Sequence, residues 1–173
     1  MKKIKISEID KKHYAIIRKS VTNSIKSLTT NFDKKNKIIL DIAPQDHENS
    51  KRYFKKAIIK TLDIDPLSGA DYVSDICKKN KKIESNYFDL IICTEVLEHT
   101  LNPFNATKEI YRILKKGGTV LVTTPLNFRI HGPLPDCWRF TEYGIRELFK
   151  NFSKITIKQI KSKNRNFFLF NTK

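Results

Sequence analysis

Acidic residues stand at similar positions after several apolar stretches of this 173-residue sequence. Asp41 comes late in the stretch KIILDI, Asp63 ends a second stretch, Asp75 ends a third, and Glu95 follows a fourth. Carboxylates gathered in this way suit a ligand with hydroxyl groups, an amine and a positive centre. A single acid after a strand is most simply a turn former or a helix cap, whereas four in series indicate a binding site.

The stretches before these acids have the character of strands in a parallel sheet. They have strand length, are rich in β-branched residues and are apolar almost without interruption, which is typical of strands covered by helices on both faces. Ligands of open α/β sheets bind beyond the carboxyl ends of the strands, where the acids would lie. The predicted strands are residues 37–42, 57–64, 70–76, 88–94 and 119–125.

Helices are predicted on either side of this sheet. Residues 1–36 are polar and lysine-rich with apolar residues close to helical spacing, so we expect one or two helices packed on the domain. The clearest helix spans residues 102–118, where Asn102 is a good N-cap, Pro103 suits the first helical position and two glycines form the stop. A shorter helix is predicted over residues 141–149.

The last part of the sequence is expected to complete the sheet. Residues 154–160 and 166–170 could form an antiparallel pair of closing strands. The resulting fold class is α/β, a Rossmann-like open sheet that is mostly parallel, with helices on both faces. The length predicts a single domain over residues 1–173.

The spacing of the acids favours a nucleoside ligand without a pyrophosphate. Asp63 stands 22 positions after Asp41, where an acid can bind both ribose hydroxyls of a nucleoside. A dinucleotide would also need a glycine-rich loop whose amides approach the pyrophosphate. The loop IAPQDHE instead contains Pro44, which has no amide hydrogen, and adds bulk and negative charge. A nicotinamide-dependent dehydrogenase is therefore the least favoured function.

Several motifs in this order resemble one known family. The chain resembles the class I S-adenosylmethionine-dependent methyltransferases, in particular the methyltransferase type 11-like group, over roughly residues 37–149. The combination of the fourth and fifth motifs is the most specific part of the resemblance. The motifs are ILDIAPQ, LDIDP, SDI, YFDLIICTEVLEH, EIYRILKKGGTVLVTTP and WRFTEYGIREL.

The resemblance implies a site for S-adenosylmethionine, with each role carried over to a matching position. The first motif receives the methionine end of the cofactor, and the family normally has GxG where this chain has APQ. The later motifs supply the acid for the ribose hydroxyls, the pair at the adenine edge and the segment facing the transferred methyl group. The cofactor-binding residues implied are Asp41, Ala43, Pro44, Gln45, Asp63, Ile64, Asp75, Ile76, Thr94, Glu95 and Val96.

Methyl transfer from a sulfonium is an in-line displacement, so alignment of the two reactants supplies most of the catalysis. An oxygen acceptor also needs a base, for which His99, His131 and Asp136 are the candidates. Glu95 and His99 also have the spacing of a structural pair on a helix. No metal site is expected, because EVLEH lacks the second histidine of the zinc-binding helix patterns and no Cys/His cluster is visible.

The loop after the fifth predicted strand should lie at the same edge of the sheet as the acids. Its proline, glycine and aromatic residues suit a rigid cover over a small substrate. Arg129, Trp138 and Arg139 could hold a carboxylate, a phosphate or a sugar ring there. Trp138 and Phe140 also suit a place in the core or in a dimer contact.

The formal net charge of +16 is not spread evenly along the chain. Residues 41–98 contain eleven acids against nine lysines and arginines, whereas the remainder contains seven acids against twenty-five. Three explanations remain open: the amino-acid usage of an AT-rich genome, the binding of a polyanion, and attraction of an acidic small substrate.

The N-terminus, the apolar stretches and the cysteines indicate the cellular compartment of the protein. The N-terminus has lysines but no apolar segment behind them, and no stretch approaches the ~18 apolar residues of a membrane span. We therefore expect a cytoplasmic protein with no membrane partner. Cys77, Cys93 and Cys137 show no CxxC pairing and are expected to be reduced and mostly buried.

Taken together, these features predict methyl transfer from S-adenosylmethionine to a small polar acceptor, such as a sugar or a glycan precursor. One alternative is a non-catalytic binding module, with a degenerate cofactor loop and a basic surface for nucleic acid or an acidic partner. Another is an RNA methyltransferase, which would explain the cofactor edge and the charge together. A small-molecule substrate is the favoured partner over nucleic acid, and the oligomeric state is left open.

Overall fold

The computed structural model describes residues 8–44, 50–132, 135–159 and 165–171. It contains a seven-stranded sheet with the strand order β3-β2-β1-β4-β5-β7-β6. The elements are α1 (Glu8–Phe32), β1 (Ile38–Ile42), η1 (Ser50–Arg52), β2 (Ile58–Asp63), β3 (Tyr72–Val73), β4 (Phe88–Thr94), η2 (Leu97–His99), α2 (Pro103–Ile113), β5 (Leu114–Pro125), α3 (Glu142–Leu148), β6 (Lys154–Gln159) and β7 (Arg165–Asn171).

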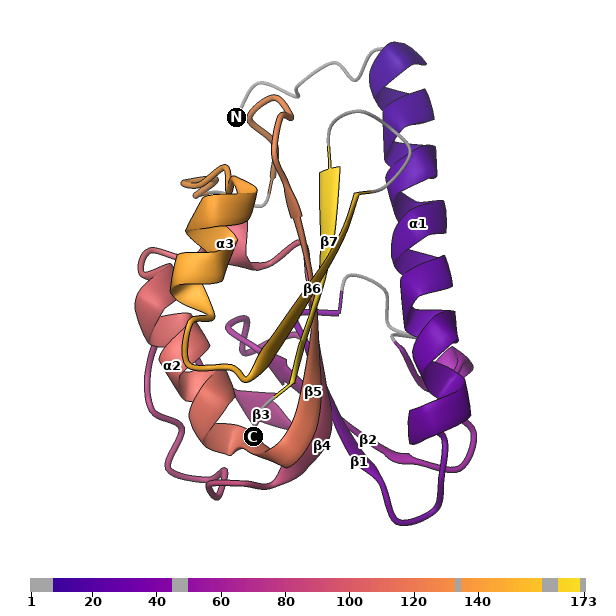
Figure 1. The fold of residues 1–173 in the computed structure, drawn as a ribbon, viewed down its shortest axis with the longest axis vertical. Helices are drawn as coiled ribbons and strands as arrows, with labels where there is room; N and C mark the ends of the chain where they lie inside the picture. The colour runs from indigo at the N-terminus through magenta and orange to yellow at the C-terminus, as the bar shows by residue number, and fades with distance from the viewer. Residues whose placement is uncertain (1–7, 45–49, 133–134, 160–164, 172–173) are drawn as a thin grey trace.

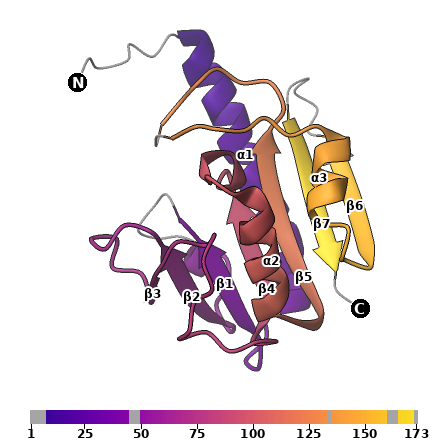
Figure 2. The same ribbon diagram turned by 90° about the vertical axis from the view of Figure 1, so that its left-hand side faces the viewer.

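The sheet lies between two layers of helix (Figure 1). The long helix α1 covers one face, and α2 and α3 cover the other, as the view turned by 90° also shows (Figure 2). On the α1 side, Ile25 and Leu28 are buried against Leu90 and other side chains of β1, β4 and β5. On the opposite side, α2 and α3 pack in a larger apolar cluster that includes Ile110 and Ile145. The predicted α/β fold with helices on both faces is confirmed.

The strands β1 to β5 run parallel, and the last two strands close the sheet in the antiparallel sense. Strand β7 pairs with both β5 and β6, so the final hairpin is inserted with its second strand innermost. Strand order reverses at the neighbouring pair β1 and β4, because β1 leads outward to β2 and β4 leads the other way to β5. Such a reversal places the ligand-binding crevice at the carboxyl ends of these strands.

Helix α2 ends earlier than the sequence predicts. Its N-terminus is as expected, because the Asn102 side chain accepts a hydrogen bond from the amide of Asn105 at 3.0 Å. The helix stops at Ile113, however, and β5 begins at Leu114 rather than at residue 119. The prediction that the glycine pair ends this helix was wrong, because the pair lies beyond the helix, in a bulge of β5 where Gly117 has a φ of 73°.

The early start of β5 has a tertiary cause. The carboxylate of Asp89 is 7% exposed and accepts hydrogen bonds from Lys37 Nζ at 2.9 Å and Lys115 Nζ at 2.7 Å. It also accepts from the amide of Ile38 at 3.0 Å. Lys115 lies in a bulge of β5, between the pairs Phe88–Leu114 and Leu90–Thr119, and this bulge brings it to the carboxylate. A buried charge is stable only when paired, so this contact overrides the local preference for helix.

Gly118 is required by a close approach of the backbone. A Cβ atom at this position would lie 2.8 Å from the carbonyl oxygen of Lys115 and 2.9 Å from the Leu114 side chain. We expect Gly118→Ala to lower the free energy of unfolding by about 1–3 kcal/mol, the usual cost of overpacking. Denaturant titration measures this, with Gly144→Ala in α3 as the control, where the nearest contact is 3.6 Å. A Gly118→Ala protein as stable as the parent would contradict the steric argument.

Other features of the chain depart from expectation in smaller ways. The N-terminal segment is a single helix, and β3 has only two residues, so Asp75 lies just beyond it rather than at its end. All three cysteines are free. Cys93 is buried and Cys77 is partly buried, but Cys137 is exposed, so the prediction of mostly buried cysteines was wrong for the last of them. Among the helices in the described ranges, none combines the length and apolar character needed to cross a membrane.

Candidate functional site

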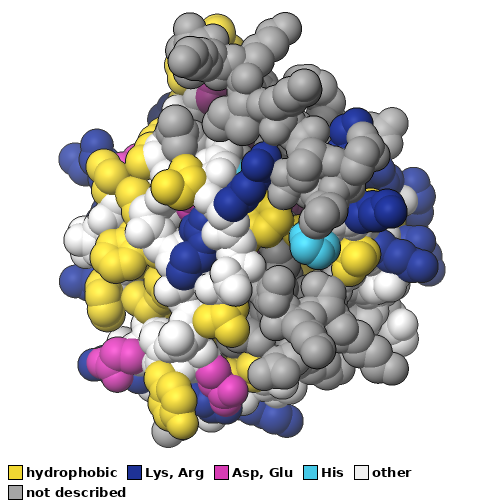
Figure 3. All heavy atoms as spheres, turned by 90° about the horizontal axis from the view of Figure 1, so that it is seen from above, with side chains coloured by type: hydrophobic (Ala, Val, Ile, Leu, Met, Phe, Trp, Pro, Cys, Tyr) yellow, Lys and Arg dark blue, Asp and Glu magenta, His cyan; other side chains and the backbone are white. Residues whose placement is uncertain are grey.

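A cavity of about 810 Å³ lies at the carboxyl ends of β1, β2, β3 and β4. Its size is within the range of small-molecule sites. Figure 3 views the molecule onto this end and shows the two largest acidic groups near the lower edge of the view, with basic side chains at the outline and across the middle. The described lining residues that carry charge are Lys51, Asp63, Asp65, Asp71, Asp75 and Glu95. The net charge of the wall is therefore negative, although that of the whole chain is strongly positive.

The turns after β1 and β4 place two residues in an uncommon backbone conformation. Ala43 has a φ of 48° and Glu95 has a φ of 58°, in the left-handed region that usually favours glycine. Their amides donate to the carbonyl oxygens of Leu62 and Thr123, at 2.7 and 2.9 Å. Strain of this kind is often kept where a functional site needs it. Ala43 thus has a glycine-like conformation at the point where the related family normally has a glycine.

Asp63 and Asp75 line the same cavity from neighbouring strands. Oδ1 of Asp63 accepts a hydrogen bond from the amide of Asp65, and Oδ1 of Asp75 accepts one from the amide of Cys77, each at 2.9 Å. These turns fix both side chains with one oxygen each. The amide of Ser74 donates to the carbonyl oxygen of Asp63 at 2.8 Å, so the segments that carry the two acids lie side by side.

Most of the expected cofactor residues lie around this cavity, although their role in binding is still a prediction. Asp41 and Thr94 are exceptions, because both line a separate hollow of about 260 Å³. Gln45 lies outside the described residues. The expected residues that line the large cavity are Ala43, Pro44, Asp63, Ile64, Asp75, Ile76, Glu95 and Val96, and His99 lies beside them.

Asp41 is buried beneath the site rather than displayed in it. Its side chain is 5% exposed, and Oδ2 accepts a hydrogen bond from the amide of Ser50 at 2.9 Å. Burial raises the pKa of Asp41 to about 6, although the hydrogen bonds from Ser50 oppose this effect. Asp41 thus anchors the chain after the β1 turn and lines the smaller hollow rather than the large cavity, and its role at the methionine end of the cofactor stays a prediction.

Some cavity walls were not foreseen from the sequence. Leu67 is 91% exposed and Leu101 is 78% exposed, yet both line the cavity. Exposed apolar side chains at a concave site would lose contact with water when a flat ring binds between them. The signal in the sequence was an apolar residue standing alone in a polar loop, which is too common to single out a ligand site.

The loop after β5 holds an ion pair that changes two expected roles. Both Asp136 oxygens pair with the Arg139 guanidinium, at 2.5 and 2.7 Å. Arg139 also donates to the carbonyl oxygens of Phe128, Arg129 and Trp138. The Arg139 guanidinium is the main cause that holds the pKa of Asp136 far below its ordinary value. Asp136 is therefore no longer expected to act as a base, and the donors of Arg139 are already used in the loop rather than for a substrate.

The other expected substrate residues flank this pair. The Trp138 indole donates through Nε1 to the carbonyl oxygen of Thr100 at 2.8 Å and stacks on Phe140 with ring centres 6.2 Å apart. Phe140 is buried and Trp138 is 38% exposed. Arg129 lies in the exposed part of the loop. Neither Arg129 nor Trp138 lines the large cavity, so contact with a substrate there would require the loop to move.

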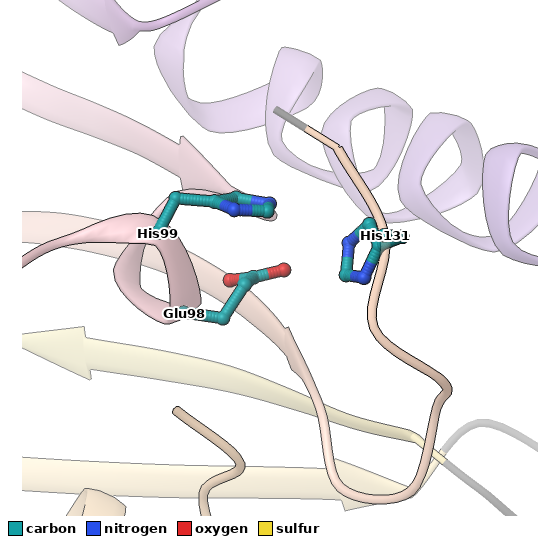
Figure 4. Close-up of side chains that lie close together, drawn as sticks. All are labelled: Glu98, His99 and His131. Atoms are coloured by element: carbon teal, nitrogen blue, oxygen red, sulfur yellow. The ribbon is translucent and has the colours of Figure 1, made fainter. Parts of the chain in front are cut away.

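Two of the expected catalytic residues do come together. The rings of His99 and His131 meet edge to face with centres 4.9 Å apart, and the Glu98 carboxylate reaches toward both (Figure 4). Glu98 is wholly buried, and burial raises its pKa to about 8. Burial also lowers the pKa of His131, although Asp136 opposes this effect. Sequence reasoning missed Glu98, because a glutamate beside a helix-like segment is normally a surface residue.

The cluster adjoins the cavity through His99. Nδ1 of His99 donates to the carbonyl oxygen of Pro135 at 3.0 Å, which fixes Nε2 as the nitrogen with the lone pair. Both His99 and Pro135 line the cavity. A group able to accept a proton therefore stands at the end of the site that lies next to Glu95 and Val96.

Comparisons with known proteins agree with this arrangement. A family model described as a methyltransferase domain matches residues 15–167. The N-methyltransferase NodS from Bradyrhizobium japonicum, solved with S-adenosyl-L-homocysteine, superposes with a TM-score of 0.66 at 14% identity, covering 91% of this chain and 87% of that one. Phosphoethanolamine N-methyltransferase 2 from Haemonchus contortus, solved with phosphomonomethylethanolamine and S-adenosylhomocysteine, gives 0.64 at 18% identity, covering 87% and 52%.

A curated relative matches a shorter part of the chain. It is described as probable polyketide synthase 10 from Dictyostelium discoideum and is 35% identical over 79 residues, which cover 42% of this chain and 3% of that protein. The chain thus spans a small fraction of that relative and about half of the Haemonchus protein. The family match and the strand order lead to one conclusion: this chain belongs to the methyltransferase domain family and has the fold of the class I S-adenosylmethionine-dependent methyltransferases.

Proposed function

We propose that this chain transfers the methyl group of S-adenosylmethionine to a hydroxyl of a small polar acceptor, such as a sugar or a glycan precursor. The observation that carries the proposal is the single cavity that joins Asp63 and Asp75 at one wall to Glu95 and His99 at another. In this arrangement the adenosine lies toward the two aspartates, and the methyl group lies toward the histidine. The acceptor then enters beneath the loop after β5.

The proposed reaction places few demands on side chains. The bond between sulfur and the methyl carbon breaks as the bond between the acceptor oxygen and that carbon forms, and the hydroxyl proton passes to Nε2 of His99. The sulfonium becomes a neutral thioether, so the negative wall favours the charged cofactor over the product. The Glu98, His99 and His131 cluster is the proposed source of acid–base chemistry, whereas alignment in the cavity supplies most of the rate enhancement.

Several further points belong to the same proposal. The Haemonchus protein is described in complex with phosphomonomethylethanolamine, a small polar molecule. The same fold can therefore receive an acceptor of the proposed size. We also propose that residues 1–173 act as one domain with α1 packed on it, and that the protein works in the cytoplasm, where the three unpaired cysteines would stay reduced.

Cofactor binding is tested by thermal unfolding with S-adenosylhomocysteine. A ligand present at 100 times its dissociation constant should add about 2.7 kcal/mol to the free energy of unfolding, and the melting temperature should rise accordingly. Transfer is tested with radiolabelled S-adenosylmethionine and a panel of sugars and sugar phosphates. Labelled product from a hydroxyl acceptor is the expected result.

Two other outcomes would point elsewhere. The absence of a thermal shift at millimolar S-adenosylhomocysteine would favour a non-catalytic binding module. Methylation of RNA instead of sugars would favour the alternative suggested by the net charge of +16, and RNA binding should then weaken steeply as salt is raised.

A further inference from the structure

Glu98, His99 and His131 form a cluster beside the cavity whose donor atoms all lie within 4.8 Å of one another. Glu98 and His99 come from η2, directly after β4, and His131 comes from the loop after β5 (Figure 4). The three side chains converge on one gap at the edge of the cavity. They offer two imidazole nitrogens and one carboxylate oxygen, a donor set that recurs in metal sites.

Two buried atoms of this cluster have no hydrogen-bond partner among the described residues. These are Oε1 of Glu98 and Nε2 of His99, and the Glu98 side chain has no exposed surface. The other carboxyl oxygen of Glu98 accepts a long hydrogen bond, 3.4 Å, from the Thr124 hydroxyl. Buried polar atoms are nearly always paired, so an unpaired carboxyl oxygen and an unpaired ring nitrogen beside one gap point to a ligand between them.

Both imidazoles are oriented as metal ligands usually are. Nδ1 of His99 donates to the Pro135 carbonyl oxygen at 3.0 Å, and Nδ1 of His131 lies 3.0 Å from Oδ2 of Asp136. In metal sites the second ring nitrogen is typically held by a carbonyl or a carboxylate, which fixes the ring and leaves Nε2 for the ion. Asp136, itself held by Arg139, thus acts as a positioning residue for His131.

We propose that Glu98 and the two histidines bind one divalent transition metal ion of the zinc, iron or cobalt type. Ligand atoms around such an ion lie roughly 3.4 Å apart at bond lengths of about 2.0–2.2 Å. The present limit of 4.8 Å therefore requires a modest rotation of the side chains, mainly that of His131 on its loop. Two imidazole nitrogens favour these metals over magnesium and calcium, which prefer oxygen ligands.

Such an ion would have open coordination positions on the side of the cavity. A three-ligand site can accept an oxygen atom of a substrate and lower the pKa of its hydroxyl proton. This consequence rests on the proposed function, whereas metal binding itself does not. With the ion in place, the cluster would activate the acceptor hydroxyl through the metal instead of through a free imidazole base. The preferred acceptor would then be a hydroxyl with access to the ion.

Titration of the chelator-treated protein with cobalt chloride tests the site. One equivalent of Co²⁺ should bind with visible absorption bands, and Zn²⁺ should displace it. Binding should weaken by more than about 100-fold in each of the variants Glu98→Gln, His99→Asn and His131→Asn. Loss of a residue that only orients a metal ligand typically weakens binding by no more than about 100-fold. His13→Asn is the matched control, because His13 is exposed on α1, and it should bind Co²⁺ like the parent.

Retained binding of S-adenosylhomocysteine and an unchanged far-UV circular dichroism spectrum show that each variant is folded. Less than one equivalent of Co²⁺ in the parent, or parent-like binding by His131→Asn, would overturn the proposal while leaving the methyltransferase function intact. Binding of Mg²⁺ but not Co²⁺ would overturn the choice of metal class. Turnover that persists unchanged after a chelator has removed the ion would overturn the activation of the acceptor hydroxyl by the metal.

Discussion

Replacing Asp63 by alanine should weaken binding of S-adenosylhomocysteine by about 100-fold, because two hydrogen bonds from ribose hydroxyls to a charged acceptor would be lost. Asp63 ends β2 and lines the cavity. Its side chain is only partly buried, so its removal should leave the fold largely unchanged. Isothermal titration measures the affinity, and the thermal shift that the ligand causes should nearly vanish.

The asparagine variant separates ligand binding from a structural role. Oδ1 of Asp63 also accepts the Asp65 amide at 2.9 Å, and an asparagine oxygen can keep this turn. If Asp63 mainly holds the turn, Asp63→Asn should restore binding. If it binds ribose, Asp63→Asn should remain weak, because the charge and one acceptor are gone. Glu84→Ala removes an exposed carboxylate that does not line the cavity and should bind like the parent.

The Asp41→Asn variant should be more stable than the parent near pH 7, by up to about 3 kcal/mol. Burial raises the pKa of Asp41 to about 6, above the value near 3.9 in an unfolded chain. The folded protein therefore binds the proton more tightly than the unfolded chain does. The contribution of Asp41 to stability is fully present below pH 4 and is lost as the pH rises to about 6.

The pH dependence distinguishes this effect from a general stabilisation. Denaturant titrations at pH 4, 5, 6 and 7 should show a gap between Asp41→Asn and the parent that is small at pH 4 and widest at pH 7. Asparagine can still accept the Ser50 amide that the carboxylate accepts at 2.9 Å. An equal gap at every pH, or a variant less stable than the parent at pH 7, would show that the ionised carboxylate is well compensated in the folded protein.

The fold was largely predictable because its strands have a local signature. Four of the five predicted parallel strands coincide closely with β1, β2, β4 and the second half of β5, since buried parallel strands are continuous apolar runs. The exact ends depend on contacts that no local pattern contains. Lys115 has the position of a basic residue in a last helical turn, yet Asp89 on β4 draws it into β5. For this reason the end of α2 could not be predicted from the sequence.

The candidate site, like the fold, was predictable only in part from the sequence. Asp63 and Asp75 could be assigned from the sequence because each ends or follows a strand, and parallel strands bring their carboxyl ends to one edge. Asp41 has the same local pattern but turns beneath the loop, where it accepts the Ser50 amide. Asp136 pairs with Arg139. Because of this pairing, Asp136 is no longer expected to act as a base, and Arg139 is no longer expected to bind a substrate. Side-chain partners are chosen by packing in three dimensions.

By itself, the sequence determined the α/β class, the approximate positions of most strands along the chain and the acids that follow them, because apolar runs and strand-end residues are local patterns. Only the tertiary structure decided that Glu98 and His99 meet His131, which stands 32 positions after His99 in the chain. Their meeting depends on how the loop after β5 folds back over η2. The physical reason is that a site forms where donor atoms lie close together in space. The spacing of residues along the chain does not determine these distances.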